Sequence, residues 1–296
     1  PICVFGEVLF DVFPDGKRVL GGAPFNVAWH LQAFGQSPWF ISSVGDDAEG
    51  EHIRAAMADW GMAVGGLATD PMHPTGRVTV SLDVGEPTYD IVDRCAYDYI
   101  DLQAMREPPA CGLLYHGSLA LRNPVSARSL AALKAGGPST VFVDVNLRDP
   151  WWSAEVLREM VRDADWVKLN RDELGLLAGG SDDLSERARR FRAENGLAGL
   201  VVTLGARGAV GFAGEDEVAE ASPPPALRVV DAVGAGDAFA AVLILGIAED
   251  WPLAVTLERA QEFASRVVQQ RGATAADRDL YLPFVDAWGV GGRTRT

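Results

Sequence analysis

Two glycines and an aspartate, placed just before an apolar helical stretch, form the segment of this chain best suited to chemistry. Residues 229–239 read Val-Val-Asp-Ala-Val-Gly-Ala-Gly-Asp-Ala-Phe. Gly234 and Gly236 allow backbone geometry that a Cβ would obstruct, so consecutive N–H groups can converge on one point at the positive end of the helix. Such a turn suits a phosphate. Asp237 would repel a stored phosphate, but beside a phosphoryl group in transfer it can accept the proton of the attacking hydroxyl.

The same residues also fit an ordinary helix start, in which glycine makes the turn and the aspartate favours the helix dipole. Short glycine motifs are weak evidence alone. Residues 231–239, however, closely resemble the C-terminal signature of the ribokinase-like (PfkB) family of carbohydrate kinases, usually Asp-Thr-x-Gly-Ala-Gly-Asp-x-Phe, with Ala232 replacing the usual threonine. The resemblance implies that Gly234, Ala235 and Gly236 form an anion-binding turn beside the base Asp237.

A second glycine pair, in the string Gly-Gly-Ala-Pro-Phe-Asn-Val-Ala at residues 21–28, opens a helix. Its glycines let the backbone approach a ligand, and Asn26 offers the donors and acceptors that suit a polyol. The string resembles the N-terminal half of the family signature, Gly-Gly-Ala-x-x-Asn-x-Ala. Asp11 follows the first apolar run, at the end of a strand where open α/β sheets bind ligands. By this resemblance Asp11, Gly22 and Asn26 hold the sugar. The alternatives are that Asp11 is a surface-turn acid and that Asn26 is a solvated or capping residue in the first helical turn.

The string Asp-Val-Asn-Leu-Arg-Asp-Pro-Trp-Trp at residues 144–152 follows another apolar run. Arg148 has a planar guanidinium that could steady phosphate charge. The string is similar to the Asp-x-Asn-Leu-Arg-x-x-x-Trp segment common in fructokinases of the family, and kinases for 2-keto-3-deoxygluconate have a similar one. The resemblance assigns Asn146 and Arg148 to substrate binding and favours fructose.

Asn170 and Glu173 stand three residues apart after the run 166–170, so they meet on one helical face. From chemistry alone the pair is best interpreted as a helix N-cap with a capping-box glutamate. Similarity to the family's Asn-x-x-Glu motif implies instead that the pair organises Mg²⁺ and its waters near the phosphates of ATP, with Glu173 acting indirectly.

Further nucleotide and cation positions follow from the same resemblance. The string Thr-Leu-Gly-Ala-Arg-Gly at residues 203–208 matches the family's Thr-x-Gly-x-x-Gly turn, although a plain hairpin turn would read the same way. Relatives also hold a monovalent cation, usually K⁺, with groups around the anion-binding turn. The implied ATP-binding residues are Asn170, Thr203, Gly205, Gly208, Gly236, Gln261 and Ala264, and the implied K⁺ residues are Asp231, Val233, Val267, Gln270 and Gly272.

The elements that must position these residues alternate between short apolar runs and helical stretches, which indicates a mainly parallel sheet covered by helices. The family resemblance implies an α/β fold of the ribokinase-like Rossmann type, a three-layer sandwich, in one kinase domain spanning residues 1–296. Apolar runs lie at 1–6, 38–45, 111–117 and 140–146, and helices are expected at about 22–35, 124–135, 182–195 and 252–271, the last one ending at a Gly272 C-cap.

Residues 75–99 break this rhythm, because Val78, Val80, Leu82 and Val84 alternate with polar residues. A strand inside a helix-covered parallel sheet should be apolar on both faces, so this stretch predicts a small antiparallel sheet outside the main layer. Together with residues 9–20, which contain a Pro-Asp-Gly turn, it should form a lid over the sugar site. The resemblance also implies a homodimer through the lid.

Composition and charge exclude several classes of protein. The chain has 296 residues, 48% of them hydrophobic, and a formal charge of −15, which argues against nucleic-acid and anionic-membrane surfaces. The apolar stretch 238–248 is far below the roughly 20 residues of a membrane span. Residues 1–10 lack a basic start, so a cytoplasmic protein is expected. The three cysteines, Cys3, Cys95 and Cys111, lack metal-ligand spacing and are interpreted as buried reduced thiols.

The predicted function is an ATP- and Mg²⁺-dependent sugar kinase, with K⁺ as a further cofactor and fructose as the favoured acceptor. The alternatives are 2-keto-3-deoxygluconate, ribose or a nucleoside as acceptor, or a catalytically silent sugar-binding regulator on the same fold. The intact Gly-Ala-Gly-Asp string argues against a catalytically silent protein, because this loop should be among the first segments to change once catalysis is lost.

Overall fold

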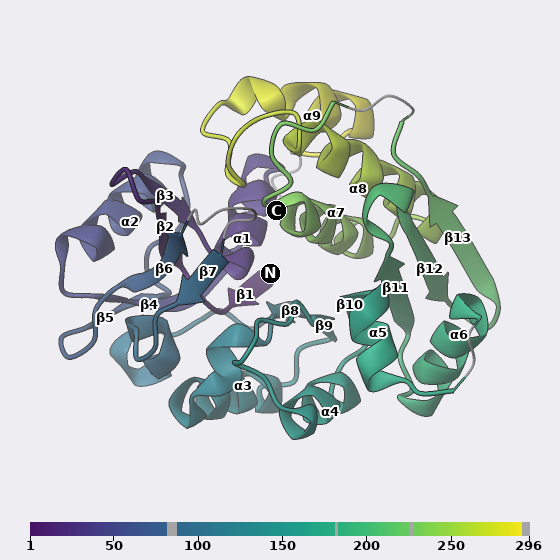
Figure 1. The fold of residues 1–296 in the computed structure, drawn as a ribbon, viewed down its shortest axis with the longest axis horizontal. Helices are drawn as coiled ribbons and strands as arrows, with labels where there is room; N and C mark the ends of the chain where they lie inside the picture. The colour runs from purple at the N-terminus through teal and green to yellow at the C-terminus, as the bar shows by residue number, and fades with distance from the viewer. Residues whose placement is uncertain (82–87, 181–182, 225–227, 292–296) are drawn as a thin grey trace.

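A nine-stranded sheet forms the centre of the molecule (Figure 1). The computed structural model describes residues 1–81, 88–180, 183–224 and 228–291. The strand order is β13-β12-β11-β10-β9-β8-β1-β4-β5. All neighbouring strands from β11 to β5 run parallel, whereas β12 runs antiparallel to both of its neighbours, β11 and β13. The strands are β1 (Ile2–Phe5), β4 (Trp39–Gly45), β5 (Leu67–Asp70), β8 (Leu113–His116), β9 (Thr140–Asp144), β10 (Trp166–Asn170), β11 (Gly199–Thr203), β12 (Ala209–Ala213) and β13 (Glu217–Ala221).

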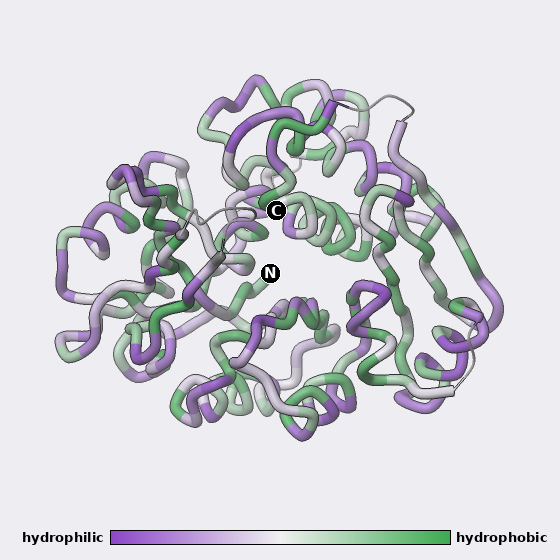
Figure 2. The backbone as a smooth tube through the Cα atoms, viewed as in Figure 1, coloured by the Kyte–Doolittle hydropathy of each residue, from purple (hydrophilic) through white to green (hydrophobic). Residues whose placement is uncertain are grey.

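Helices cover both faces of this sheet and confirm the predicted three layers. Strand residues alternate between two hydrophobic clusters, so Val4 packs on one side while Cys3 and Phe5 pack on the other. Figure 2 shows the hydrophobic colour of α7, which is buried along most of its length. One face carries α1 (Ala23–Ala33), α2 (Ala48–Asp59), α7 (Ala235–Ala248), α8 (Leu253–Val267) and α9 (Leu282–Trp288), and the other carries α3 (Pro124–Ala135), α4 (Ala154–Arg162), α5 (Arg171–Leu177) and α6 (Leu184–Glu194).

A separate four-stranded sheet has the order β3-β2-β6-β7 (Figure 1). In β6, buried Val78 and Val80 alternate with exposed residues, which confirms a strand with one solvent-exposed face. Leu82 and Val84 lie outside the described residues. The prediction of an antiparallel sheet is wrong at one pair, because β2 and β6 run parallel. These strands are β2 (Leu9–Val12), β3 (Arg18–Gly21), β6 (Gly76–Ser81) and β7 (Thr88–Ile91), and the short 3₁₀ helices of the chain are η1 (Ala96–Tyr99), η2 (Leu102–Ala104), η3 (Leu119–Arg122), η4 (Gly205–Arg207) and η5 (Arg278–Leu280).

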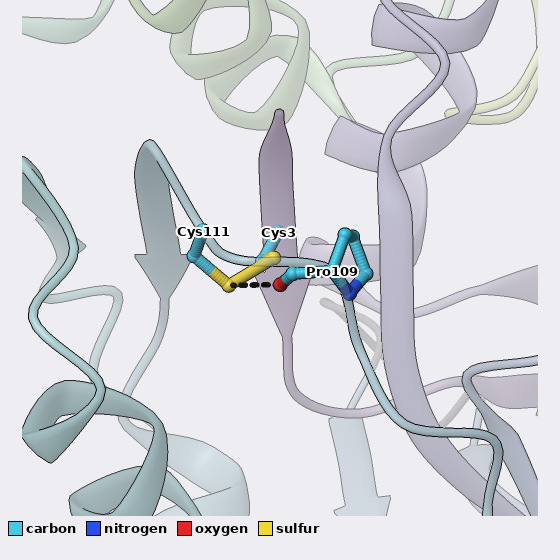
Figure 3. The surroundings of a disulfide bond; sticks show 3 residues. All are labelled: Cys3, Pro109 and Cys111. Carbon is cyan, nitrogen blue, oxygen red and sulfur yellow. Dashed lines mark hydrogen bonds between the residues drawn. A yellow bond between two sulfur atoms is a disulfide. The ribbon is translucent and has the colours of Figure 1, made fainter.

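Cys3 and Cys111 form a disulfide with their Cα atoms 5.8 Å apart (Figure 3). The prediction of three reduced thiols is therefore wrong for two of them, while Cys95 is a buried free thiol. Cys3 lies in β1, and Cys111 lies two residues before the start of the neighbouring strand β8. Parallel pairing brings the two residues together although 108 positions separate them, a contact that cysteine spacing cannot reveal.

The last long helix ends earlier than predicted. α8 stops at Val267 with Val268 as its C-cap, not at Gly272. The carbonyl of Val268 accepts the N–H groups of Val230 and Asp231. The chain after α8 therefore binds the segment that precedes the anion-binding turn and does not continue the helix. In the described part of the chain, no helix combines the length and apolar character of a membrane crossing.

Candidate active site

The anion loop, which we define as residues 234–237, begins α7 at the centre of the molecule. Gly234 has a left-handed backbone with φ of 81°, and an added Cβ would lie 2.6 Å from the Cα of Ala273. Only glycine avoids both the strain and the clash. Asp237 stands in the first helical turn, where the Asn26 Nδ2 donates to its Oδ2 at 2.7 Å. The structure thus joins the two predicted signatures across 211 residues of sequence.

The surroundings of Asp237 hold its pKa well above the ordinary value of 3.8. Burial is the largest cause and raises the pKa to about 6; the Asn26 hydrogen bond and the positive charge of Lys168 lower it, while the negative charge of Asp144 raises it further. A carboxyl group that titrates near 6 is ionised at neutral pH yet accepts a proton readily. Asp237 is therefore suited to act as a general base.

Sequence reasoning missed a buried ion pair beneath the anion loop. Lys168 Nζ lies 2.9 and 2.8 Å from the two carboxylate oxygens of Asp144, and the side chains are only 7% and 2% exposed. Nζ is also 3.7 Å from the position that a Cβ on Gly236 would occupy. A lysine in the middle of an otherwise buried strand was the available signal, because such a charge requires a partner.

The sugar loop, which we define as residues 21–23, brings the predicted substrate residues together. An ideal Cβ on Gly21 would lie 3.8 Å from Asn26 Oδ1 and 3.9 Å from Asp11 Oδ2, so these two side chains flank one point. Gly22 has φ of +110°, and a Cβ there would lie 2.7 Å from the carbonyl oxygen of Glu7. Burial raises the pKa of Asp11 to about 6. A pocket of about 370 Å³ opens between this region and the C-terminal loops, lined among others by Asp11, Val19, Asp231 and Gly272.

Arg148 is the positive group of the sugar end. It is exposed, and its charge lowers the pKa values of Glu7, Asp11 and Asp237. Asn146 has a left-handed backbone with φ of 38°, and its carbonyl accepts the hydroxyl of Ser118. The segment after β9 thus brings a guanidinium to the predicted substrate residues.

Asn170 and Glu173 form the capping box that chemistry alone favoured. Asn170 Oδ1 accepts the N–H groups of Asp172 and Glu173, and Glu173 Oε2 accepts the N–H of Asn170 at 2.7 Å. Glu173 Oε1 also accepts the N–H of Leu147 at 2.8 Å, so this carboxylate ties together the segments that follow β9 and β10. Both of its oxygens already have a partner, which fits an indirect role near a metal ion better than direct ligation.

The remaining predicted nucleotide residues lie at the end of β11, in the turn after it, and on α8. Thr203 ends β11, and the turn after it requires glycine at position 208, because a Cβ there would overlap the carbonyl oxygen of Ala221. Gly205 has φ of +60° in the same turn. Gln261 and Ala264 lie on α8, and within the described residues neither makes a hydrogen bond to that turn, since the Gln261 amide donates to Ser265.

The predicted K⁺ residues surround the approach to the anion loop. The carboxylate of Asp231 accepts the N–H groups of Val233 and Gly272, both at 3.0 Å, which holds the two loops together. The Val267 carbonyl accepts the N–H of Gln270, whose buried Nε2 has no partner. In the part of the chain that the structure describes, no group of three or more histidine, cysteine or acidic side chains could hold a metal ion. A cation here would depend on carbonyl and amide oxygens.

The nine-stranded sheet is covered by helices on both faces, a small second sheet stands apart from it, and Asp237 lies in the first turn of α7. These features fit a carbohydrate kinase. The family model described as pfkB family carbohydrate kinase matches residues 6–279, and the chain belongs to this family.

Its relatives include several fructokinases. The chain is 35% identical to a fructokinase of Klebsiella pneumoniae, over 96% of this chain and 97% of that protein. It also superposes on the fructokinase of Vibrio cholerae O395 solved with fructose, ADP and a calcium ion, with a TM-score of 0.80, 29% identity and coverage of 95% of this chain and 97% of that one. An uncharacterized sugar kinase of Pyrococcus horikoshii gives a TM-score of 0.82 at 26% identity, covering 98% of this chain and 99% of that one. These matches confirm the predicted family and fold.

Proposed function

We propose that this kinase transfers the γ-phosphoryl group of ATP to a hydroxyl of fructose. The contact between Asn26 and Asp237 supports the proposal most strongly, because it places a predicted sugar-binding amide 2.7 Å from the predicted base. The fructokinases among the relatives support fructose as the acceptor.

In the proposed mechanism the sugar lies between Asp11, Gly22 and Asn26. Asp237 accepts the proton of the attacking hydroxyl as that oxygen bonds to the γ-phosphorus and the bond to the ADP oxygen breaks. The N–H groups of the anion loop, at the positive end of α7, stabilise the charge that develops on the phosphoryl group. The small sheet lies over the sugar end as a lid and would exclude water that would otherwise compete as the acceptor.

Mg²⁺ would neutralise the phosphates of ATP. It usually keeps several waters and binds through few protein carboxylates, which fits a Glu173 whose oxygens already accept backbone N–H groups. For K⁺, Gln270 precedes Gly272 by two residues and has a buried side-chain nitrogen without a partner. This fits a site that needs one more ligand, because an amide flip would present the side-chain oxygen in place of the nitrogen. A homodimer through the lid stays a prediction, which sedimentation of the intact chain would test.

The charge of the site disfavours an acidic sugar. The positive charge of Arg148 lowers the pKa values of three carboxyl groups, those of Glu7, Asp11 and Asp237. A 2-keto-3-deoxygluconate carboxylate would add a further negative charge to this group. A neutral sugar avoids that repulsion.

A coupled ADP-release assay with MgATP and K⁺ tests the acceptor, using fructose, ribose, glucose, adenosine and 2-keto-3-deoxygluconate at matched concentrations. We expect the highest kcat/KM for fructose. A higher value for another acceptor would replace fructose in the proposal, and no ADP release with any of them would favour the silent sugar-binding protein.

The rate should fall steeply in mild acid. Asp237 and Asp11 both have pKa values raised to about 6, and both are proposed to act ionised, as base and as acceptor of sugar hydroxyls. Activity should therefore be lost as pH falls through 6, with a slope of log kcat/KM approaching two per pH unit instead of one. In Asp11→Asn the remaining activity should fall with unit slope, whereas an unchanged wild-type rate at pH 5 would contradict the prediction.

A further inference from the structure

Glu49, in the first turn of α2, joins two strands of the small sheet. Its side chain is only 5% exposed, and Nε and Nη2 of Arg77 on β6 lie 2.7 and 2.6 Å from its Oε2. Nη1 of Arg18 on β3 lies 3.0 Å from its Oε1, as an ion pair without the geometry of a hydrogen bond. Burying a carboxylate is costly unless charged partners surround it. Glu49 is therefore held between the two arginines.

Strand β2 lies between β3 and β6 and also contacts α2 (Figure 1). The ring of Phe10 on β2 lies 5.4 Å from the imidazole of His52 on α2, measured between ring centroids. In the strand register Phe10 is opposite Arg77, and Val12 is opposite Arg18. Because side chains alternate between the two faces of a sheet, Phe10 and both arginines belong to one face, which is turned toward α2.

Asp11 belongs to the opposite face of the same strand. It lies opposite Val19 on β3 and Val78 on β6, and Asp11 and Val19 both line the pocket of about 370 Å³. Each of these two valines directly follows, in the sequence, one of the arginines that contact Glu49. Contacts with α2 on one face of the small sheet therefore hold the backbone that carries the proposed sugar-binding carboxylate on the other face.

A second contact fixes the start of β6 to the same helix. Asp47 is the N-cap of α2, and its Oδ1 accepts the N–H of Gly50 at 2.8 Å and the hydroxyl of Thr75 at 2.7 Å. Its Oδ2 accepts the N–H of Thr75 at 2.9 Å, and Thr75 immediately precedes β6. The first turn of α2 thus holds β6 at its start and, through Glu49, further along the strand.

We propose that Glu49 is a positioning residue for the sugar site: by holding Arg18 and Arg77 it fixes the small sheet on α2 and thereby sets where Asp11 meets the sugar. Asp11 lies outside the central sheet, so its position relative to the base Asp237 depends on how the small sheet rests on the rest of the molecule. In the alternative, Glu49 serves α2 alone, as an acid that favours the helix dipole. The role of Asp11 rests on the proposed function, whereas the anchoring of the small sheet does not.

Amide hydrogen exchange tests the anchoring without sugar or nucleotide, so its failure is distinct from a failure of the proposed function. In Glu49→Gln the amides of residues 9–12 and 18–21 should exchange about tenfold faster than in the wild type, while those of residues 113–116 in the central sheet should keep their rate. Glu51→Gln is the matched control, because it removes an exposed acid from the same helical turn. Unchanged exchange at residues 9–12 and 18–21 in Glu49→Gln would overturn the proposal.

Steady-state kinetics test the positioning of Asp11, with the sugar that gives the highest kcat/KM in the acceptor assay. Glu49→Gln should raise the KM for that sugar about tenfold, because a small misplacement of a binding group is costly. The KM for ATP should stay at the wild-type value, since the implied nucleotide residues lie outside the small sheet. Equal increases in both KM values, or an unchanged KM for the sugar, would contradict a role in positioning Asp11.

A double-mutant cycle separates the anchor from the helix-dipole alternative. In an Arg18→Gln/Arg77→Gln background, Glu49→Gln should raise the KM for the sugar no further, because the partners of the carboxylate are already gone. An acid that serves only the helix dipole does not need the arginines. A full tenfold increase in that background would therefore refute the proposal.

Discussion

Asp237→Asn should lower kcat for sugar phosphorylation by about 10²- to 10⁴-fold, the range by which general bases accelerate reactions. The asparagine oxygen can still accept the Asn26 amide, so the 2.7 Å contact and the start of α7 should persist. What disappears is the group that takes the proton of the attacking hydroxyl. The KM for ATP should change little, because ATP binding does not depend on that proton. Steady-state kinetics with fructose and MgATP measure both quantities.

The exposed Asp286→Asn on α9 provides the matched substitution and should keep the wild-type rate. Equal melting temperatures for the wild type and Asp237→Asn would show that the loss is chemical and not structural. Residual turnover within tenfold of the wild type would remove Asp237 from the role of base.

Lys168→Met should produce the largest loss of stability. It leaves the carboxylate of Asp144, 2% exposed, without its partner, and breaking a buried pair in this way costs about 3–5 kcal/mol. The double variant Lys168→Met/Asp144→Leu should recover most of that loss, since apolar residues can replace a buried pair at little net cost. Urea unfolding monitored by circular dichroism measures the free energies.

The same substitution at a looser ion pair offers a control. Lys134 Nζ lies 3.9 Å from Asp163, whose side chain is 60% exposed, so Lys134→Met should cost no more than about 1 kcal/mol through that pair. Similar losses at Lys134 and Lys168, or a double variant no more stable than Lys168→Met, would show that the buried pair does not stabilise the centre of the sheet.

Local pattern predicts much of this fold. Continuous apolar runs indicated the parallel strands because both faces of the central sheet are covered, and the alternation in β6 indicated a strand with one wet face. The antiparallel assignment of the small sheet failed at β2 and β6, since alternation reports which face is buried and not which neighbour a strand pairs with. The end of α8 was misplaced because its stop depends on contacts with residues 230–231, far away in sequence.

Residues of the candidate site were predictable where their type and spacing stand out in the sequence. Glycines with special backbone angles are conspicuous, and Gly22 and Gly234 both have positive φ. The Asn26 contact with Asp237 could be expected only through the family resemblance, because no local rule spans 211 residues. Lys168 was missed as a site residue, since a single charge in an apolar strand does not reveal which group will pair with it once the strands assemble.

Phosphorus NMR of a mixture of this protein, MgATP, K⁺ and fructose tests the central claim most directly. As the γ-phosphate signal declines, we expect a sugar-phosphate signal to grow in equal amount with ADP, and Asp237→Asn to give neither on the same timescale. ATP consumption that yields inorganic phosphate in place of sugar phosphate, or no consumption at all with fructose, would contradict the account.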